Sequence, residues 1–286
     1  MEHTLLSFGH GYSARALARR LLPLDWHLIG TTRTEDKLAG LMEEGIEPRI
    51  FPGANMKPAL DQASHILISA GPGEHGDPVL AELRDEIAKR AKNFRWVGYL
   101  STTGVYGDHN GDWVDEVTPL APSTKRGEAR VKAEAQWQSI EGLRLHIFRL
   151  AGIYGPGRGP FSKVRKGTAR RIIKDGQVFS RTHVDDIAQV LHASINAPNP
   201  GGIYNVCDDD PAPPQDVIAH AAELLGLPVP PTTRFEDADM SPMALSFYAE
   251  SKKVRNDRIK EELGVKLKYP DYKSGLKALL EQEEGA

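Results

Sequence analysis

The sequence predicts an α/β protein with a doubly wound parallel sheet, a Rossmann fold, and a smaller C-terminal substrate lobe. Three observations predict it. Short apolar runs alternate with amphipathic stretches over residues 1–150, a glycine-containing turn follows the first run, and prolines cluster late, at 211–214 and 228–231. Strands that alternate with helices across short joints require βαβ crossovers and a parallel sheet. Ligands of such sheets bind beyond the carboxyl ends of the strands, so the residues there are the site candidates.

The expected elements follow in chain order. The first strand spans residues 4–8, and residues 12–22 carry apolar side chains at helical spacing until Pro23 ends the helix. The further elements are a strand at 26–32, a helix at 35–44 stopped by Gly45, a weaker strand at 49–51, a strand at 65–70, a helix at 77–93, a strand at 95–101 and a helix at 124–140. We expect residues 1–155 to form the dinucleotide-binding core, completed by about 180–207. Residues 156–179 and 208–286 would form the smaller lobe.

Composition narrows the functional classes. The formal net charge of −3 argues against a general nucleic-acid binder, which is usually basic. The basic residues between Lys163 and Arg171 are then either a solvated helix face or a site for a small anionic group. Cys207 is the only cysteine, so no intrachain disulfide forms, and a reducing compartment is expected. No signal peptide or membrane-spanning run is evident, so we expect a cytoplasmic protein without membrane partners.

A phosphate-binding turn follows the first strand. The segment Gly9-His10-Gly11-Tyr12-Ser13-Ala14 has the form G-x-G-x-x-A and opens a helix. Gly9 permits the tight turn, Gly11 lets the backbone approach a pyrophosphate, and Ala14 lets the helix pack closely on the strand. The helix N-terminus offers free N–H groups to phosphates. A βα turn without a ligand is the alternative, but the position at the first strand favours a dinucleotide site that includes Gly9, Gly11, Tyr12 and Ser13.

The tip of the second strand favours NADP. A dinucleotide fold selective for NAD carries an acidic residue there, whereas this sequence reads Gly30-Thr31-Thr32-Arg33. An arginine pairs with a 2′-phosphate, and the hydroxyls of Thr31 and Thr32 donate hydrogen bonds to it. NAD is the less favoured cofactor. The alternative is that Arg33 is a solvated residue neutralised by nearby acids.

Several motifs together resemble one family. The segments Tyr99-Leu100-Ser101-Thr102-Thr103-Gly104-Val105-Tyr106-Gly107, Arg149-Leu150-Ala151-Gly152-Ile153-Tyr154-Gly155-Pro156-Gly157, Thr182-His183-Val184-Asp185-Asp186-Ile187-Ala188 and Tyr204-Asn205-Val206 occur in order. They resemble the short-chain dehydrogenase/reductase superfamily, in its extended branch of NAD(P)-dependent epimerases and dehydratases. The resemblance spans nearly the whole chain.

The resemblance implies roles for particular residues. Thr102 takes the place of the family's catalytic Ser or Thr, whose hydroxyl binds the substrate oxygen at the reacting carbon. Asp185 and Asp186 would be structural, and no metal site is implied. The residues that would line the cofactor are Ala70, Gly71, Pro72, Ser101, Ala151, Gly152 and Ile153.

The sequence departs from the family at its catalytic dyad. The family carries Tyr-x-x-x-Lys on the helix after the fifth strand, and the ending K-x-x-A-E aligns Arg126 with the Tyr and Arg130 with the Lys. Arg130 could still hold the nicotinamide ribose, but arginine stays protonated and is a poor acid or base. Tyr106 or a residue from the C-terminal lobe could substitute for the missing tyrosine. The chain is then either an atypical NADP-dependent oxidoreductase or epimerase-like enzyme acting on a small or sugar-nucleotide-like substrate, or a non-catalytic NADP-binding sensor.

Association is the last expectation. The two helices at 77–93 and 124–140 correspond to the pair that forms a dimer bundle in many relatives, so a homodimer is an open prediction. The apolar residues that would serve it are Val79, Leu83, Ile87, Trp137 and Ile140. The alternative is that these side chains cover the sheet of their own chain.

Overall fold

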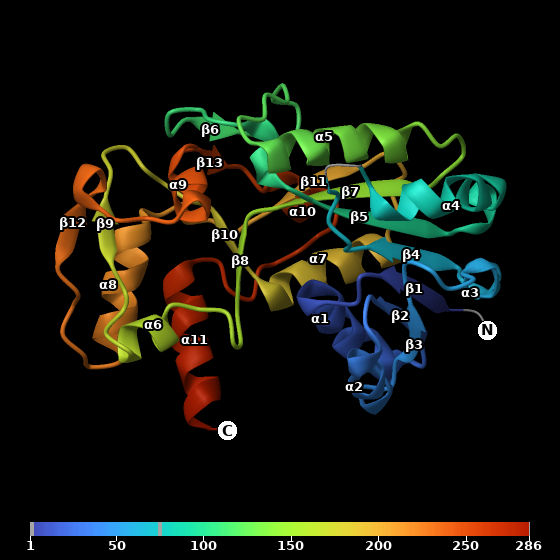
Figure 1. Ribbon diagram of the computed structural model, residues 1–286, viewed down its shortest axis with the longest axis horizontal. Coiled ribbons are helices and arrows are strands. Elements are labelled where there is room, and N and C mark those ends of the chain that lie inside the picture. The colour runs from blue at the N-terminus through green and yellow to red at the C-terminus, as the bar shows by residue number, and fades with distance from the viewer. Residues whose placement is uncertain (1–2, 74–75, 286) are drawn as a thin grey trace.

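The computed structural model describes residues 3–73 and 76–285, and a seven-stranded parallel sheet forms its centre (Figure 1). The strand order is β11-β7-β5-β4-β1-β2-β3. The strands are β1 Thr4–Phe8, β2 His27–Thr32, β3 Glu47–Ile50, β4 His65–Ile68, β5 Trp96–Thr102, β7 Leu145–Leu150 and β11 Ile203–Val206. Beside β1 the order reverses, because β2 pairs on one side of it and β4 on the other. The predicted Rossmann fold is therefore present, and its switch point lies between β1 and β4.

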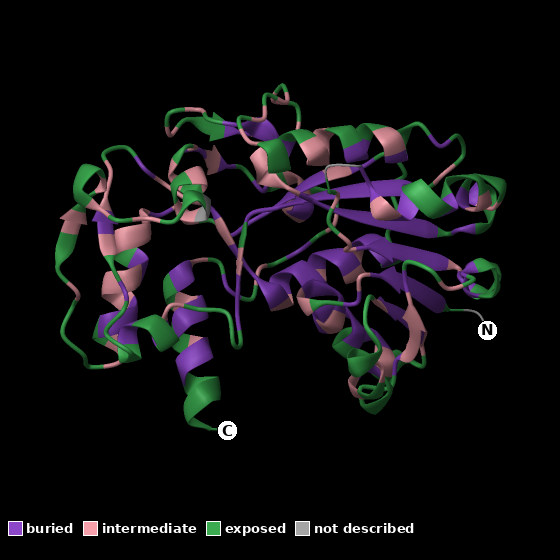
Figure 2. Cartoon of the chain, in the orientation of Figure 1, coloured by how far each residue is buried: buried purple, intermediate pink, exposed green. Residues whose placement is uncertain are grey.

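Helices cover both faces of the sheet (Figure 1). One face packs against α3 Lys57–Gln62, α4 Pro78–Lys89 and α5 Lys125–Gln138, and the other against α1 Tyr12–Leu21, α2 Leu38–Glu43 and α7 Val184–Asn196. The sheet is mostly buried (Figure 2), because every strand except the half-buried edge strand β3 contributes apolar side chains to both clusters. This two-sided burial explains why the strands read as short continuous apolar runs.

Element boundaries differ from the expected ones where local chemistry intervenes. The helix expected at 77–93 is α4 followed by the separate 3₁₀ turn η3 Ala91–Asn93. Asp77 lies outside it as the cap, its carboxylate accepting from the backbone N–H groups of Val79 and Leu80. The helix expected at 35–44 likewise begins as a 3₁₀ turn. That turn is η2 Glu35–Lys37. The other short turns are η1 Leu22–Leu24, η4 Thr103–Tyr106 and η5 Phe235–Asp237.

The smaller lobe packs around its own apolar cluster, on the left of Figure 1. It contains α6 Phe161–Arg165, β9 Arg171–Ile173, α8 Pro214–Leu224, β12 Thr232–Arg234, α9 Pro242–Tyr248 and α11 Tyr272–Glu284. The parallel pair β8 Gly152–Tyr154 and β10 Arg181–His183 connects this lobe to the sheet. The pairing of β9 with β12 was not foreseen, because three-residue strands carry no readable period.

The segment after residue 208 is not all lobe. β13 Lys253–Val254 pairs with β6 Trp113–Val114, and α10 Asp257–Glu261 buries Ile259 against the α7 face of the core. The chain therefore returns to the core before α11 enters the lobe.

Two further observations concern surfaces. Within residues 3–73 and 76–285, no helix combines the length and the apolar character needed to span a bilayer. The side chains considered for a dimer bundle are at most 8% exposed and belong to the cluster between α4, α5 and the sheet. They cover their own sheet, and the outer faces of both helices are polar.

Candidate cofactor site and active site

The turn after β1 is shaped by Gly9. Its φ of +77° is a left-handed conformation, and a Cβ atom at this position would lie 2.9 Å from the backbone nitrogen of Ala70. The Gly9 N–H donates to Oγ1 of Thr31 at 2.8 Å, and the Gly11 N–H donates to the Gly9 carbonyl at 2.7 Å. The ends of β1, β2 and β4 therefore meet at one tight turn that tolerates no side chain.

The N-terminus of α1 offers donors without an internal acceptor. Gly11 is the cap residue, no side chain caps the helix, and no acidic residue occupies its first turn. Ser13 and Ala14 are buried, Ala14 against Leu17 and the sheet. A helix start with unsatisfied N–H groups and a partial positive charge fits a phosphate.

Arg33 follows β2 directly and is exposed. Among the described residues it forms no ion pair, so Glu35 and Asp36 do not neutralise it. Thr31 is buried and committed to Gly9, whereas the Thr32 hydroxyl accepts only a long contact of 3.5 Å from the Thr34 N–H. At the strand tip, Arg33 and Thr32 are thus the groups available to an anion.

Tyr12 ties the phosphate turn to a distant loop. Its hydroxyl donates to the Pro156 carbonyl at 3.0 Å, and the Arg158 guanidinium lies 5.6 Å from the centre of its ring. Gly155 makes this approach possible, since a Cβ there would lie 2.7 Å from the Tyr12 hydroxyl. Tyr12 therefore acts here as a contact between α1 and the loop after β8.

Arg130 also lies near the carboxyl ends of the strands, beside the end of β5. Its guanidinium donates to the Leu100 carbonyl and to the Tyr99 hydroxyl, and it is the nearest group to Gly71 after β4. Ala70 and Pro72 flank Gly71, and Ala151, Gly152 and Ile153 follow β7 at the neighbouring strand end. The structure thus brings the residues expected around the nicotinamide half of a dinucleotide to one edge.

Thr102 ends β5 and is half-buried. Its hydroxyl accepts from the Gly104 N–H at 3.2 Å, which starts the turn η4 and leaves the hydroxyl proton free to donate. The first turn of α5 packs on η4, because a Cβ at Gly127 would lie 2.7 Å from the Gly104 carbonyl. Arg126 directly precedes Gly127 in this contact. Its guanidinium lies 5.9 Å from the ring centre of the exposed Phe247 on α9.

Tyr106 is placed differently from the expected catalytic role. It is fully buried, its hydroxyl donates to Asn205 Oδ1 at 2.7 Å, and it accepts from Arg149 at 2.9 Å. Burial raises the pKa of Tyr106 to about 12. A buried hydroxyl with both partners satisfied is not positioned to exchange protons with a substrate, so we assign Tyr106 to the core.

A buried charged network surrounds Tyr106. Arg149 forms an ion pair with Glu134 at 2.8 Å, with both side chains at most 4% exposed, and Glu134 also accepts from the Ser101 hydroxyl. The Ser101 side chain, expected at the cofactor, is thus committed to this network. Arg149 begins the motif at residues 149–157, and Glu134 ends the K-x-x-A-E pattern. The sequence alone does not show that these two side chains pair. They hold β5, β7 and α5 together beneath Thr102.

Asp186 has the structural role implied by the sequence. It is buried, and its carboxylate accepts from the backbone N–H groups of Lys268 at 2.7 Å and Tyr269 at 3.1 Å. It therefore fastens the start of α7 to the segment before α11. Within the described ranges, no group of three or more His, Cys, Asp or Glu side chains gathers in a way that could hold a metal ion.

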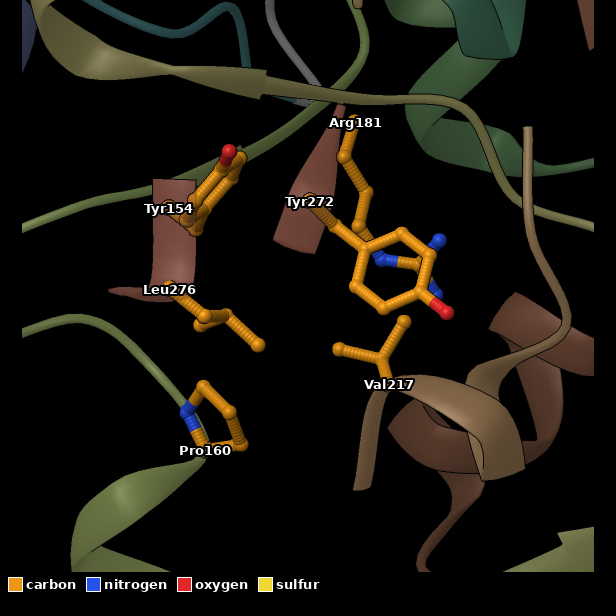
Figure 3. Close-up of a pocket in the computed structure, with 6 residues that line it drawn as sticks. All are labelled: Tyr154, Pro160, Arg181, Val217, Tyr272 and Leu276. Atoms are coloured by element: carbon orange, nitrogen blue, oxygen red, sulfur yellow. The ribbon is translucent and has the colours of Figure 1, made fainter. Parts of the chain in front are cut away.

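The smaller lobe contains a cavity of about 100 Å³ (Figure 3). Most of its lining is apolar, and Arg181 is its one charged group. The lining residues are Tyr154, Pro160, Arg181, Val217, Tyr272 and Leu276. Sequence patterns did not indicate this cavity, because its walls come from β8, β10, α8, α11 and the loop before α6.

Comparison with known proteins shows which family the central part of the chain resembles. The model of the NAD dependent epimerase/dehydratase family matches residues 80–207, which include Thr102, Arg130 and the strands β5, β7 and β11. This segment of the chain is similar to that family. The matched range excludes the Gly9 turn, so the phosphate site rests on its own geometry.

Other similar proteins match nearly the whole chain. A solved structure of a functionally unknown conserved protein from Silicibacter pomeroyi DSS is 64% identical, with a TM-score of 0.95 over 98% of this chain and 99% of that one. Protein YeeZ of Escherichia coli K12 is 29% identical over 92% of this chain and 95% of its own length. A human epimerase family protein solved with NADPH shares the fold, with a TM-score of 0.75, 17% identity and coverage of 97% and 99%.

Proposed function

We propose that this chain is an NADP-dependent oxidoreductase or epimerase-like enzyme that acts on a small substrate at Thr102. The observation that carries the proposal is the row of groups along one sheet edge. The uncapped start of α1, Arg33, which forms no ion pair among the described residues, and the Arg130 guanidinium lie at the carboxyl ends of β1, β2 and β5, as an extended dinucleotide would require. NADPH in the human epimerase family structure supports the same cofactor class.

The residues fit the cofactor at each end. The Gly9 turn and α1 would hold the pyrophosphate, Arg33 and Thr32 the 2′-phosphate, and Arg130 the nicotinamide ribose. A bound nicotinamide would supply or accept a hydride. Thr102 would donate its hydroxyl proton in a hydrogen bond to the substrate oxygen, because the Gly104 N–H occupies one acceptor lone pair and leaves that proton free. No tyrosine lies on α5, so Thr102 would orient the substrate without serving as a proton reservoir.

The cofactor part is tested by titrating the protein with NADPH and NADH and following nucleotide fluorescence. Arg33→Asp should weaken NADPH binding roughly tenfold or more, because a lost charge-assisted pairing costs about 1.5–3 kcal/mol. Arg95→Asp is the matched control. It makes the same charge change at an exposed residue that directly precedes β5, at the amino-terminal ends of the strands and so away from the proposed site. Absence of binding by both nucleotides would overturn the proposal.

The catalytic part is tested with Thr102→Val, which removes the hydroxyl and keeps the side-chain shape. We expect NADPH to bind as before while turnover of a carbonyl substrate, found by screening for NADPH oxidation, falls. Equal turnover by Thr102→Val would contradict the role of the hydroxyl.

A non-catalytic NADP-binding sensor is the second candidate. One observation favours it: arginines occupy positions 126 and 130, and Tyr106 is buried. None of these three residues can release a proton to a substrate near neutral pH. Under this alternative the protein binds NADPH but oxidises none of it with any carbonyl or sugar-nucleotide substrate. Turnover by homogeneous protein would exclude it.

A further inference from the structure

The cavity in the smaller lobe has the character of a pocket for a small organic acid. Apolar side chains from α8 and α11, including Val217 and Leu276, form its walls, and the Arg181 guanidinium and the Tyr272 hydroxyl lie on the same side of it (Figure 3). Sites for small ligands combine such an apolar lining with few polar groups that fix orientation. An apolar lining with one cation suits a molecule that has a carboxylate at one end and an apolar body.

The Arg181 guanidinium is held by two hydrogen bonds and keeps further N–H donors available. One of its terminal nitrogens donates to the carbonyls of Phe179 and Ala212, each at 2.9 Å. Its other nitrogens have no hydrogen-bond partner within the part of the chain that the structure describes, and no carboxylate there lies within ion-pair distance of them. A fixed guanidinium with free donors presents the fork that carboxylates bind.

The neighbouring carboxyl of Asp208 forms no ion pair with Arg181 among the residues that the structure describes. Asp208 is 2% exposed, and neither of its carboxyl oxygens has a hydrogen-bond partner. Burial raises the pKa of Asp208 to about 8, although the positive charge of Arg181 opposes that rise. Arg181 is half-buried, and an anionic ligand in the cavity would balance its positive charge.

The cavity adjoins the cofactor edge. Arg181 begins β10, which pairs with β8 in the register Arg181 opposite Gly152. A Cβ at Gly152 would lie 3.8 Å from the Arg181 Cγ, so the stem of Arg181 passes directly beside the residue expected at the nicotinamide. Tyr154, two residues after Gly152, forms part of the cavity wall.

From these contacts we propose that the cavity binds the carboxylate of a small organic acid, and that this acid is the substrate. Arg181 and Tyr272 would hold the carboxylate, and the rest of the molecule would extend past Gly152 toward Thr102. The assignment as substrate rests on the proposed function. Binding of the acid itself does not.

The test is calorimetric titration with benzoate, with benzamide as its neutral isostere and no nucleotide present. We expect benzoate to bind at least tenfold more tightly than benzamide. Val217→Phe, which fills the cavity, and Arg181→Gln should each reduce benzoate binding at least tenfold. Tyr272→Phe, which removes one hydroxyl and keeps the ring, should weaken it by a smaller factor.

The control is Arg165→Gln, which removes an exposed arginine of the same lobe that pairs with Glu283. It should bind benzoate as the parent protein does. Equal affinity for benzoate and benzamide, or unchanged benzoate binding by a folded Val217→Phe variant, would overturn the proposal. Failure of the proposed function gives a different result, because benzoate would then bind while NADPH would not.

The substrate assignment has its own comparison. NADPH oxidation is measured with 4-carboxybenzaldehyde and with benzaldehyde, and the carboxylate-bearing aldehyde should have the lower KM. Arg181→Gln should raise that KM and leave the KM for benzaldehyde unchanged. Equal KM values for the two aldehydes with the parent protein would overturn the assignment.

Discussion

Arg149 on β7 and Glu134 on α5 form an ion pair at 2.8 Å in the buried layer beneath Thr102. Removing one partner strands the other charge away from water, which costs about 3–5 kcal/mol. We therefore expect Arg149→Met to lower the free energy of unfolding by that amount in urea denaturation. Arg165→Met breaks an exposed pair of similar length and should cost about 0–1 kcal/mol. Equal losses in the two variants would refute the role of burial.

The second prediction concerns Tyr106. Tyr106→Phe leaves Asn205 and Arg149 each without one partner, and an unsatisfied buried polar group costs about 1–3 kcal/mol. We expect reduced stability with unchanged NADPH affinity and unchanged turnover per folded molecule. A variant that keeps its stability and its NADPH binding but loses turnover would restore Tyr106 to the active site.

The third prediction concerns Gly9. Gly9→Ala places a methyl group 2.9 Å from the Ala70 nitrogen and a side chain at φ +77°. The turn must shift, so NADPH binding should fall at least tenfold in the fluorescence titration. Gly142→Ala is the control, because Gly142 has φ +73° but lies in the turn before β7, remote from the site. It should lose stability and keep NADPH affinity, whereas a comparable loss of affinity there would point to strain alone.

The fourth prediction is a pH dependence. His146 is fully buried beside Trp96, and burial lowers its pKa from 6.5 to about 4. The folded state thus favours the neutral ring. The resulting stability is present above pH 6.5 and is lost as the pH falls toward 4. His146→Phe should remove about 2 kcal/mol of the loss between pH 6.5 and pH 5, at about 1.4 kcal/mol per pH unit.

The measurement is urea denaturation of both proteins at pH 7.5 and pH 5. Above pH 6.5 the ring is neutral in both states, so the difference in stability between the two proteins should not change with pH there. Parallel slopes of the two proteins down to pH 5 would show that His146 does not titrate on unfolding.

The core and the phosphate turn could be predicted from the sequence because each depends on neighbouring residues. Gly9, Gly11 and Ala14 act within one turn, and Arg33 is placed by the strand that precedes it. Tyr106 was misjudged because burial depends on β7 and β11, which lie about 40 and 100 residues further along the chain. The Arg181 cavity has the same origin, since its walls meet only after the lobe has folded.

The path of the chain between core and lobe limits how the protein can be divided. The chain leaves the core after β8, returns to it with β10, leaves again after β11, returns with β13 and ends in α11. Neither part is therefore a continuous stretch of sequence, and a cut at any one boundary leaves both halves incomplete. Several separate chain connections between core and lobe also restrict the movement of one relative to the other. We therefore expect a lobe joined in this way to move only slightly relative to the core, which favours small substrates.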